Sequence, residues 1–331
     1  MEKIKITFLG TGSAIPTPRR NHPAVLIQYK DENLLFDCGE GTQRQFRKAH
    51  LNPCKLTRIF ITHWHADHVL GIPGLLQTLM LNGYRKTLHI YGPSGTEKMA
   101  RLYIGLFAHK GQKFPIQIHE INSSEKSSSH NAKDSTRVGG WVTKKGGHLK
   151  ESTILDTKEF TIQAEPMQHD TPSLAYSFTI KSKSRINKSK LAKLKLPHGK
   201  LIGELAQGKK IKYKGKTIDG KKLIYGEPQR KITYVMDTCP NPNTIKIAKD
   251  SDLLICESTH NEQGKELAKK HKHLTAKQAA EIAKSSNSKK LILTHLSQRN
   301  ETKHAQKQLL QEAKKIFKNT SIAEDLDSLE I

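Results

Sequence analysis

The stretch RIFITHWHADH, from Arg58 to His68, places three histidines and an aspartate directly after an apolar, β-branched run. Residues 58–62 have the composition of a buried strand, so the polar residues should lie at the open end of that strand. Imidazole and carboxylate groups suit zinc, and a catalytic zinc keeps one position open for water. A loop that is rich in histidine by chance is the alternative, because the chain has 17 histidines in 331 residues. Three histidines within residues 63–68 favour a metal site.

The size and charge of the chain restrict its class. Its 331 residues are enough for one large α/β domain or two smaller ones with a substantial core. Its 56 Lys and Arg against 31 Asp and Glu give a net charge of +25, which attracts phosphate polymers or anionic membranes. No apolar run approaches the roughly 20 residues that span a membrane. Met1 leads into a strand-like segment rather than a signal peptide, and four widely spaced cysteines predict a reducing cytoplasm.

Strand and helix patterns alternate along both halves of the chain. In the first half we expect strands at 4–9, 24–29, 34–37, 58–62 and 87–91, with helices at 74–81 and 96–107. In the second half we expect strands at 160–164, 175–180, 231–236, 252–256 and 290–293, with helices at 276–285 and 301–317. This alternation predicts an α/β fold with two sheets covered by helices.

Two segments interrupt the alternation. Residues 122–152 are rich in Ser, Lys, Gly and Asn, which predicts an insertion of low complexity. Residues 181–222 contain 15 Lys and Arg against two acidic residues, a balance of +13 that is about half the net charge of the chain. Several leucines in this second segment predict a small folded protrusion. Its lysines favour a clamp on a phosphate backbone, and a solvated lysine-rich face is the alternative.

Single candidate ligands also follow three later strands. His169, Asp237 and His295 each lie at or just beyond a predicted strand end, where α/β folds gather their sites. Alone, each histidine could be a surface residue and Asp237 a turn residue. With residues 63–68 they supply five histidines and two aspartates, enough for two metal ions that share one carboxylate. Two ions about 3.5–4 Å apart stabilise the attacking and leaving oxygens of a phosphoryl displacement, which favours a nucleic-acid phosphodiester as substrate.

Two further residues could assist such a site. Thr275 and Gln278 predict a capping box at the start of the helix 276–285. His273 then precedes a helix N-terminus, where it could contact the scissile phosphate or protonate the leaving oxygen. An ordinary loop histidine is the alternative. Asp37, at the end of the strand 34–37, could orient a ligand histidine.

Together these motifs resemble the metallo-β-lactamase superfamily and, within it, the ribonuclease Z family. The H-x-H-x-D-H run at residues 63–68 is the superfamily hallmark, which is shared with thioesterases, lactamases and phosphodiesterases. More specific are FDCGEGTQ at 36–43, GIPGLL at 71–76, LPHGKL at 196–201 and LTHLSQR at 293–299. The similarity extends from about residue 4 to residue 299 and beyond, and only the insertion at 122–152 falls outside it.

The resemblance implies a fold and a set of site residues. The expected fold is a single αβ/βα sandwich domain over 1–331, with residues 181–222 forming a basic arm that contacts tRNA. One zinc would be held by His63, His65 and His169, and a second by Asp67, His68 and His295, with Asp237 bridging the two. Asp67 is the expected proton acceptor, and His273 matches the catalytic histidine before the capped helix. In this family the arm usually reaches tRNA bound mainly by the other subunit of a homodimer.

We therefore expect a cytoplasmic, zinc-dependent endoribonuclease that removes the 3′ trailer of precursor tRNA and leaves a 3′-hydroxyl. A metal-activated hydroxide would attack the phosphodiester. The alternatives are a small-molecule phosphodiesterase or arylsulfatase, a thioester or lactam hydrolase, and an inactive RNA-binding relative. The long basic segment disfavours the small substrates, because they need no such reach. The complete set of seven ligands disfavours the inactive relative.

Overall fold

The computed structural model describes residues 2–107, 114–122, 142–143, 152–197 and 199–331. Most of the insertion expected at 122–152 therefore lies outside the described residues. Among the described helices, none has both the length and the apolar character that a membrane crossing requires.

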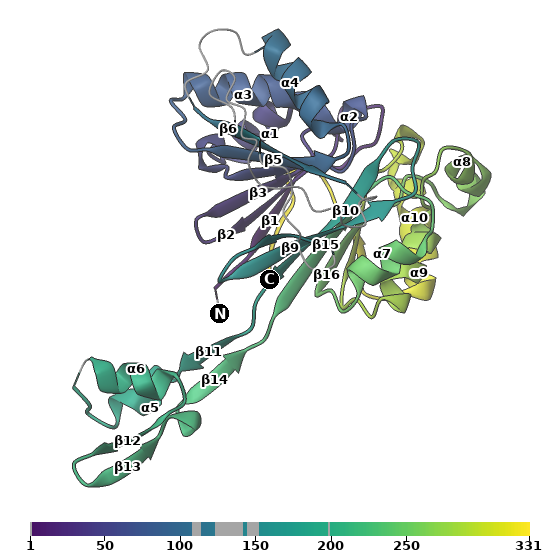
Figure 1. Cartoon of the computed structure of the whole chain (residues 1–331). Coiled ribbons are helices and arrows are strands. Elements are labelled where there is room, and N and C mark those ends of the chain that lie inside the picture. Colours follow the sequence, from purple (N-terminus) through teal and green to yellow (C-terminus); the bar gives the residue numbers. More distant parts are fainter. Residues whose placement is uncertain (1, 108–113, 123–141, 144–151, 198) are drawn as a thin grey trace.

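Two β-sheets face each other at the centre of the molecule (Figure 1). In the described part of the chain, the first sheet has the strand order β19-β1-β2-β3-β4-β5-β6-β7. Its strands are β1 (Lys5–Gly10), β2 (Ala24–Tyr29), β3 (Glu32–Phe36), β4 (Arg58–Phe60), β5 (Leu88–Pro93), β6 (Ile116–Ile121), β7 (Val142–Thr143) and β19 (Ser328–Glu330). The pairs from β3 to β7 are parallel, and the others are antiparallel.

The second sheet has the order β18-β17-β16-β15-β10-β9-β8. Its strands are β8 (Thr153–Asp156), β9 (Phe160–Met167), β10 (Ser173–Ile180), β15 (Arg230–Val235), β16 (Leu253–Glu257), β17 (Leu291–Thr294) and β18 (Thr320–Ile322). Strands β15 to β18 are parallel to one another, and β10 is antiparallel to both β9 and β15. Strands β9, β15, β16 and β17 therefore run in the same direction and end at the same edge.

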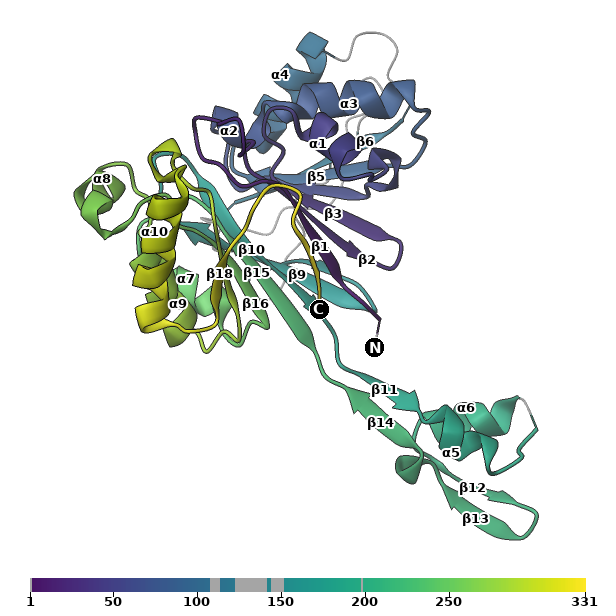
Figure 2. The ribbon, with the colours of Figure 1, turned by 180° about the vertical axis from the view of Figure 1, so that it is seen from behind.

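Helices cover the outer faces of both sheets (Figures 1 and 2). The first sheet is covered by α1 (Thr42–Lys48), α3 (Gly71–Leu81) and α4 (Thr96–Phe107), and the second by α7 (Pro242–Ala248), α9 (Ala276–Ser285) and α10 (Lys303–Ile316). The short helices α2 (Ala66–Val69) and α8 (Lys265–Lys270) lie outside these two layers. One apolar cluster lies between the first sheet and its helices, and another lies between the second sheet and its helices. A third joins the sheets through residues such as Phe36, Phe60, Tyr176 and Tyr234. The predicted αβ/βα sandwich is confirmed.

Several predicted bounds shift for local reasons. The strand predicted at 58–62 ends at Phe60, because the amide of Thr62 donates to the Asp37 side chain (2.8 Å) instead of to a neighbouring strand. The helix predicted at 74–81 begins at Gly71, since Pro73 lies in its first turn, where proline is tolerated. The helices at 96–107 and 276–285 have the predicted bounds, and the expected capping box of Thr275 and Gln278 is present.

A long arm leaves the second sheet after β10 and returns into β15 (Figure 2). Its stalk is the antiparallel pair β11 (Lys183–Ile186) and β14 (Ile224–Glu227). Its tip contains α5 (Lys188–Ala192), α6 (Lys200–Ala206), β12 (Lys210–Tyr213) and β13 (Lys216–Asp219). The tip has its own apolar cluster around Leu205, Ile211 and Leu223, so the predicted basic segment is a folded protrusion.

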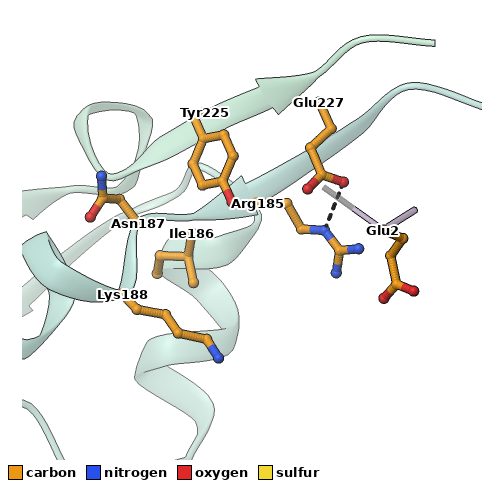
Figure 3. A pocket seen from close by; sticks show the side chains of 7 residues that line it. All are labelled: Glu2, Arg185, Ile186, Asn187, Lys188, Tyr225 and Glu227. Carbon is orange, nitrogen blue, oxygen red and sulfur yellow. Dashed lines mark hydrogen bonds and ion pairs between the residues drawn. The ribbon is translucent and has the colours of Figure 1, made fainter. Parts of the chain in front are cut away.

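An open hollow lies at the base of the arm (Figure 3). There Arg185 of β11 pairs with Glu227 of β14, with 3.1 Å between Nε and Oε2. This pair links the two stalk strands next to Glu2 at the start of the chain.

Candidate metal centre

The predicted ligands lie where strands of both sheets end. His63 and His65 follow β4, and Asp67 and His68 lie in the short helix α2. His169, Asp237 and His295 follow β9, β15 and β17. Because those three strands run in the same direction, their ligands meet at one edge of the second sheet, opposite the end of β4.

The structure brings all seven side chains together in two groups. One potential ligand atom from each of His63, His65, His169 and Asp237 lies within 4.8 Å of the others in its group. A second group of the same dimensions contains Asp67, His68, Asp237 and His295. Asp237 belongs to both groups, as a bridging carboxylate would.

Distances between the ligand atoms suit tetrahedral coordination. Ligands about 2.0–2.1 Å from a tetrahedral zinc lie about 3.3 Å from one another. In the first group, Nε2 of His169 lies 3.2 Å from Nδ1 of His65, and Nε2 of His63 lies 3.4 Å from Oδ2 of Asp237. In the second group, Nε2 of His68 lies 3.3 Å from Oδ2 of Asp67.

Buried polar atoms in the two groups have unused bonding capacity. Among the described residues, Nε2 of His63, His68 and His295 and Oδ1 of Asp237 are buried without a hydrogen-bond partner. Each such atom costs about 1–3 kcal/mol when it stays unpaired. Four of them in one place fit a metal ion as their missing partner, since the set consists of imidazole nitrogens and a carboxylate oxygen. The residues therefore fit a metal-ion site.

Asp37 orients one of these histidines. Its buried carboxylate accepts hydrogen bonds from the amide of Thr62 (2.8 Å), from Nδ1 of His68 (2.9 Å) and from the hydroxyl of Tyr234 (3.1 Å). Because an ionised carboxylate only accepts, Nδ1 of His68 is the nitrogen that donates to Asp37, and Nε2 is the nitrogen that faces the ligand group. The predicted contact between Asp37 and a candidate ligand is present.

Two other histidines are oriented by the same principle. Nδ1 of His169 lies 3.2 Å from the carbonyl oxygen of Lys272, which only accepts, so Nδ1 is the donor. Nδ1 of His295 lies 2.8 Å from Oγ1 of Thr259. In both rings Nε2 is the nitrogen left for the ligand group, and the other ring nitrogen is hydrogen-bonded, as is usual for metal-binding histidines.

Three strand-end residues of the site have a left-handed backbone. The φ angles are +56° at Asp37, +30° at Asp237 and +59° at His295. Such conformations cost about 1–3 kcal/mol each and persist only where the surrounding structure enforces them. They turn these side chains out of the strand direction and toward the centre.

Glu257 is a site residue that sequence reasoning misses. It ends β16, is fully buried, and accepts hydrogen bonds from the amide of Thr238 (2.8 Å) and the hydroxyl of Thr259 (2.6 Å). Its Oε2 lies 3.3 Å from Nδ1 of His273. The signal that could have found it is an acidic residue directly after the apolar run 253–256, the pattern that identifies Asp237.

His273 lies beside the two ligand groups, just before the capped helix α9. Its ring centroid is 5.4 Å from that of His169 and 5.6 Å from that of His295. Burial lowers the pKa of His273, but the carboxylates of Glu257 and Asp237 outweigh burial and raise it to about 9. His273 is therefore protonated at neutral pH and can contact an anion or donate a proton.

Comparison with known proteins agrees with this geometry. A family model described as anti-Pycsar protein Apyc1 matches residues 4–102, a part that contains His63 to His68 but none of the later ligands. A ribonuclease Z from Methanothermobacter thermautotrophicus is 35% identical over 99% of this chain and 97% of its own length. Another, from Archaeoglobus fulgidus, is 37% identical over 99% of this chain and 97% of its own length. The crystal structure of the short form of human tRNase Z superposes with a TM-score of 0.66 at 28% identity and covers 98% of both chains. The chain therefore belongs to the ribonuclease Z family.

Proposed function

We propose that this protein is the endoribonuclease that removes the 3′ trailer of precursor tRNA and leaves a 3′-hydroxyl on the tRNA. The observation that carries the proposal is the pair of ligand groups that share Asp237. The family membership and the +13 charge of residues 181–222 support tRNA as the substrate. A small phosphodiester would need no arm of this length. A role in tRNA processing is consistent with the cytoplasm as its location.

The proposed cofactor is a pair of zinc ions. His63, His65 and His169 would hold one ion, Asp67, His68 and His295 would hold the other, and Asp237 would bridge them. When bound, such a pair supplies a water nucleophile at neutral pH and neutralises charge on the reacting phosphate.

The chain's own residues would handle the protons. Burial raises the pKa of Asp67, but His68 and His295 lower it far more, so Asp67 is ionised at neutral pH, as a proton acceptor must be. Protonated His273 would contact the phosphate and give a proton to the leaving oxygen. Glu257 would hold His273 in place and in its protonated form.

The arm and the centre lie at opposite ends of the second sheet. Strand β15 begins at Arg230, next to the arm, and ends beside Asp237. Figures 1 and 2 show the arm extending away from the body on this side. We therefore propose a homodimer in which the arm of one subunit holds tRNA whose 3′ end is in the centre of the other.

Cleavage of a defined precursor tests the proposal. The purified protein is incubated with a precursor tRNA, with and without chelator, and the cut position is mapped. We expect a cut at the 3′ end of the mature tRNA that chelator prevents. The His65→Ala variant should not cleave but should still bind tRNA in a gel-shift assay. Normal cleavage by this variant, or no cleavage by the metal-loaded wild type, would refute the proposal.

Deleting residues 181–222 tests the arm separately. KM for precursor tRNA should rise far more than KM for a small chromogenic phosphodiester. Equal losses on both substrates would refute the role of the arm.

A further inference from the structure

The C-terminal segment joins the two sheets close to the metal centre. Strand β18 is at the edge of the second sheet, where it pairs with β17, and β19 is at the edge of the first sheet, where it pairs with β1. Residues 323–327 cross from one to the other and are visible in yellow in Figure 2. Residues 11–13 also reach across to the second sheet, where Gly12 forms a bridge with Leu296.

Asp325 anchors the crossing segment to the first sheet. Its Oδ1 accepts from the hydroxyl of Thr11 (2.7 Å), and its Oδ2 accepts from the amide of Asn21 (2.8 Å) and from Nε2 of Gln45 (2.9 Å). Arg20 is 1% exposed and donates to both Oγ1 of Thr11 and the carbonyl of Ala323, at 2.6 Å each. The hydroxyl of Thr11 therefore donates to Asp325 of the crossing segment and accepts from Arg20, which also contacts Ala323 of that segment.

The backbone of the loop 11–13 in turn holds the residue after His295. The amide of Leu296 donates to the carbonyl of Thr11 (3.0 Å), and the amide of Ser13 donates to the carbonyl of Leu296 (3.2 Å). His295 has a left-handed backbone, so its position depends on the contacts that flank it. Thr259 fixes its ring, and Leu296 fixes the chain that follows it.

The other ligand group depends on different contacts. His63 contacts the hydroxyl of Thr62 at 3.1 Å, and His169 contacts the carbonyl of Lys272 and the ring of His65. None of these contacts involves residues 11–13 or 323–327. Asp237 belongs to both groups and the hydroxyl of Thr62 contacts both His63 and His68, but His295 belongs only to the second group. A disturbance that acts through Leu296 on His295 should therefore weaken mainly the second group.

We propose that Asp325 is a positioning residue for His295, and through it for the ligand group that His295 completes, and that it acts through Thr11 and Leu296. This inference rests on the proposed binding of two ions. Loss of the Asp325 carboxylate leaves the Thr11 hydroxyl without its acceptor and relaxes the loop 11–13, so His295 holds its ion less tightly. Outer contacts of metal ligands typically change metal affinity by about 10–100-fold.

Metal titration of the Asp325→Ala variant tests the inference. Apoprotein is titrated with Zn²⁺ in competition with a chromophoric chelator, and with Co²⁺ by its visible absorption. We expect the wild type to bind two ions. In the variant, one ion should bind at least about 10-fold more weakly while the affinity of the other is unchanged.

A double-mutant design identifies the affected group. The His65→Ala variant should bind mainly the ion of the group that contains His295. Adding Asp325→Ala to this variant should weaken the binding of that ion. In a His295→Ala background the remaining ion should not respond to Asp325→Ala. Equal weakening in both backgrounds, or none in either, would overturn the inference.

A matched control separates positioning from general stability. Asp252 also accepts from a backbone amide, that of Lys231 (2.8 Å), and it lies at the end of the second sheet away from the centre. Asp252→Ala should lower Tm without changing either metal affinity, and an equal metal defect in this control would refute a specific role for Asp325. If Asp325→Ala does not fold, Asp325→Asn keeps one acceptor oxygen and should give a smaller defect in the same ion. A wild type that binds fewer than two ions would refute the proposed cofactor instead.

Discussion

Replacing Lys212, Lys214 and Lys216 by glutamine tests how the arm binds tRNA. The three lysines lie in or between β12 and β13 at the tip of the arm, and all are exposed. In the part of the chain that the structure describes, no carboxylate forms an ion pair with them. Each lost phosphate contact should reduce the slope of log affinity against log salt by about 0.7–0.9, and three contacts should reduce it by about 2.1–2.7.

The assay measures KM for precursor tRNA at 50 and 200 mM salt. Between 50 and 200 mM salt, KM should rise for both proteins. The rise for the wild type should be about 20- to 40-fold larger than the rise for the triple variant, as the difference in slope requires. Hydrolysis of a small chromogenic phosphodiester should not change, because the ligand groups lie at the other end of the second sheet. An unchanged salt slope in the variant would refute phosphate contacts by these lysines.

A control with the same charge change distinguishes contact from long-range attraction. Lys303, Lys307 and Lys314 are exposed on α10, on the outer face of the second sheet. Replacing these three by glutamine should leave the salt slope near its wild-type value. A reduction equal to that of the arm variant would mean that net charge, and not the arm, determines the salt dependence.

Three further predictions concern the centre. Asp37→Asn removes the carboxylate that orients His68, so metal affinity should fall about 10–100-fold in a chelator competition assay; an unchanged affinity would argue against the orienting contact. Glu257→Gln removes a negative charge that raises the pKa of His273. The alkaline limb of the pH profile of kcat should therefore move to lower pH. An alkaline limb at the wild-type pH would mean that protonated His273 is not the proton donor. Removal of metal should lower Tm, because buried atoms of His63, His68, His295 and Asp237 then lack partners; calorimetry that gives the same Tm for both forms would contradict this.

Most of the candidate metal centre could be predicted from the sequence because each candidate ligand lies just beyond an apolar run. His169, Asp237 and His295 are far apart in the chain, but β9, β15 and β17 run in the same direction and end at one edge. Glu257 has the same signal, but the seven other donors already account for two candidate metal sites. Its partner His273 shows why it matters, and that contact is visible only in three dimensions.

Other features could not be read from periodicity. Thr11 and Asp325 are 314 residues apart, and β18 and β19 have only three residues each, too few to show a strand pattern. The leucines of residues 181–222 predicted a folded protrusion, but its long two-stranded stalk depends on the pairing of β11 with β14. Such pairings are set by long-range contacts that local sequence does not encode.

Anomalous diffraction at the zinc edge, from crystals of protein purified without chelators, tests the central claim most directly. We expect two peaks, one among His63, His65 and His169 and one among Asp67, His68 and His295, with Asp237 in contact with both. A single peak, or peaks away from Asp237, would contradict a two-metal centre built from these strand ends.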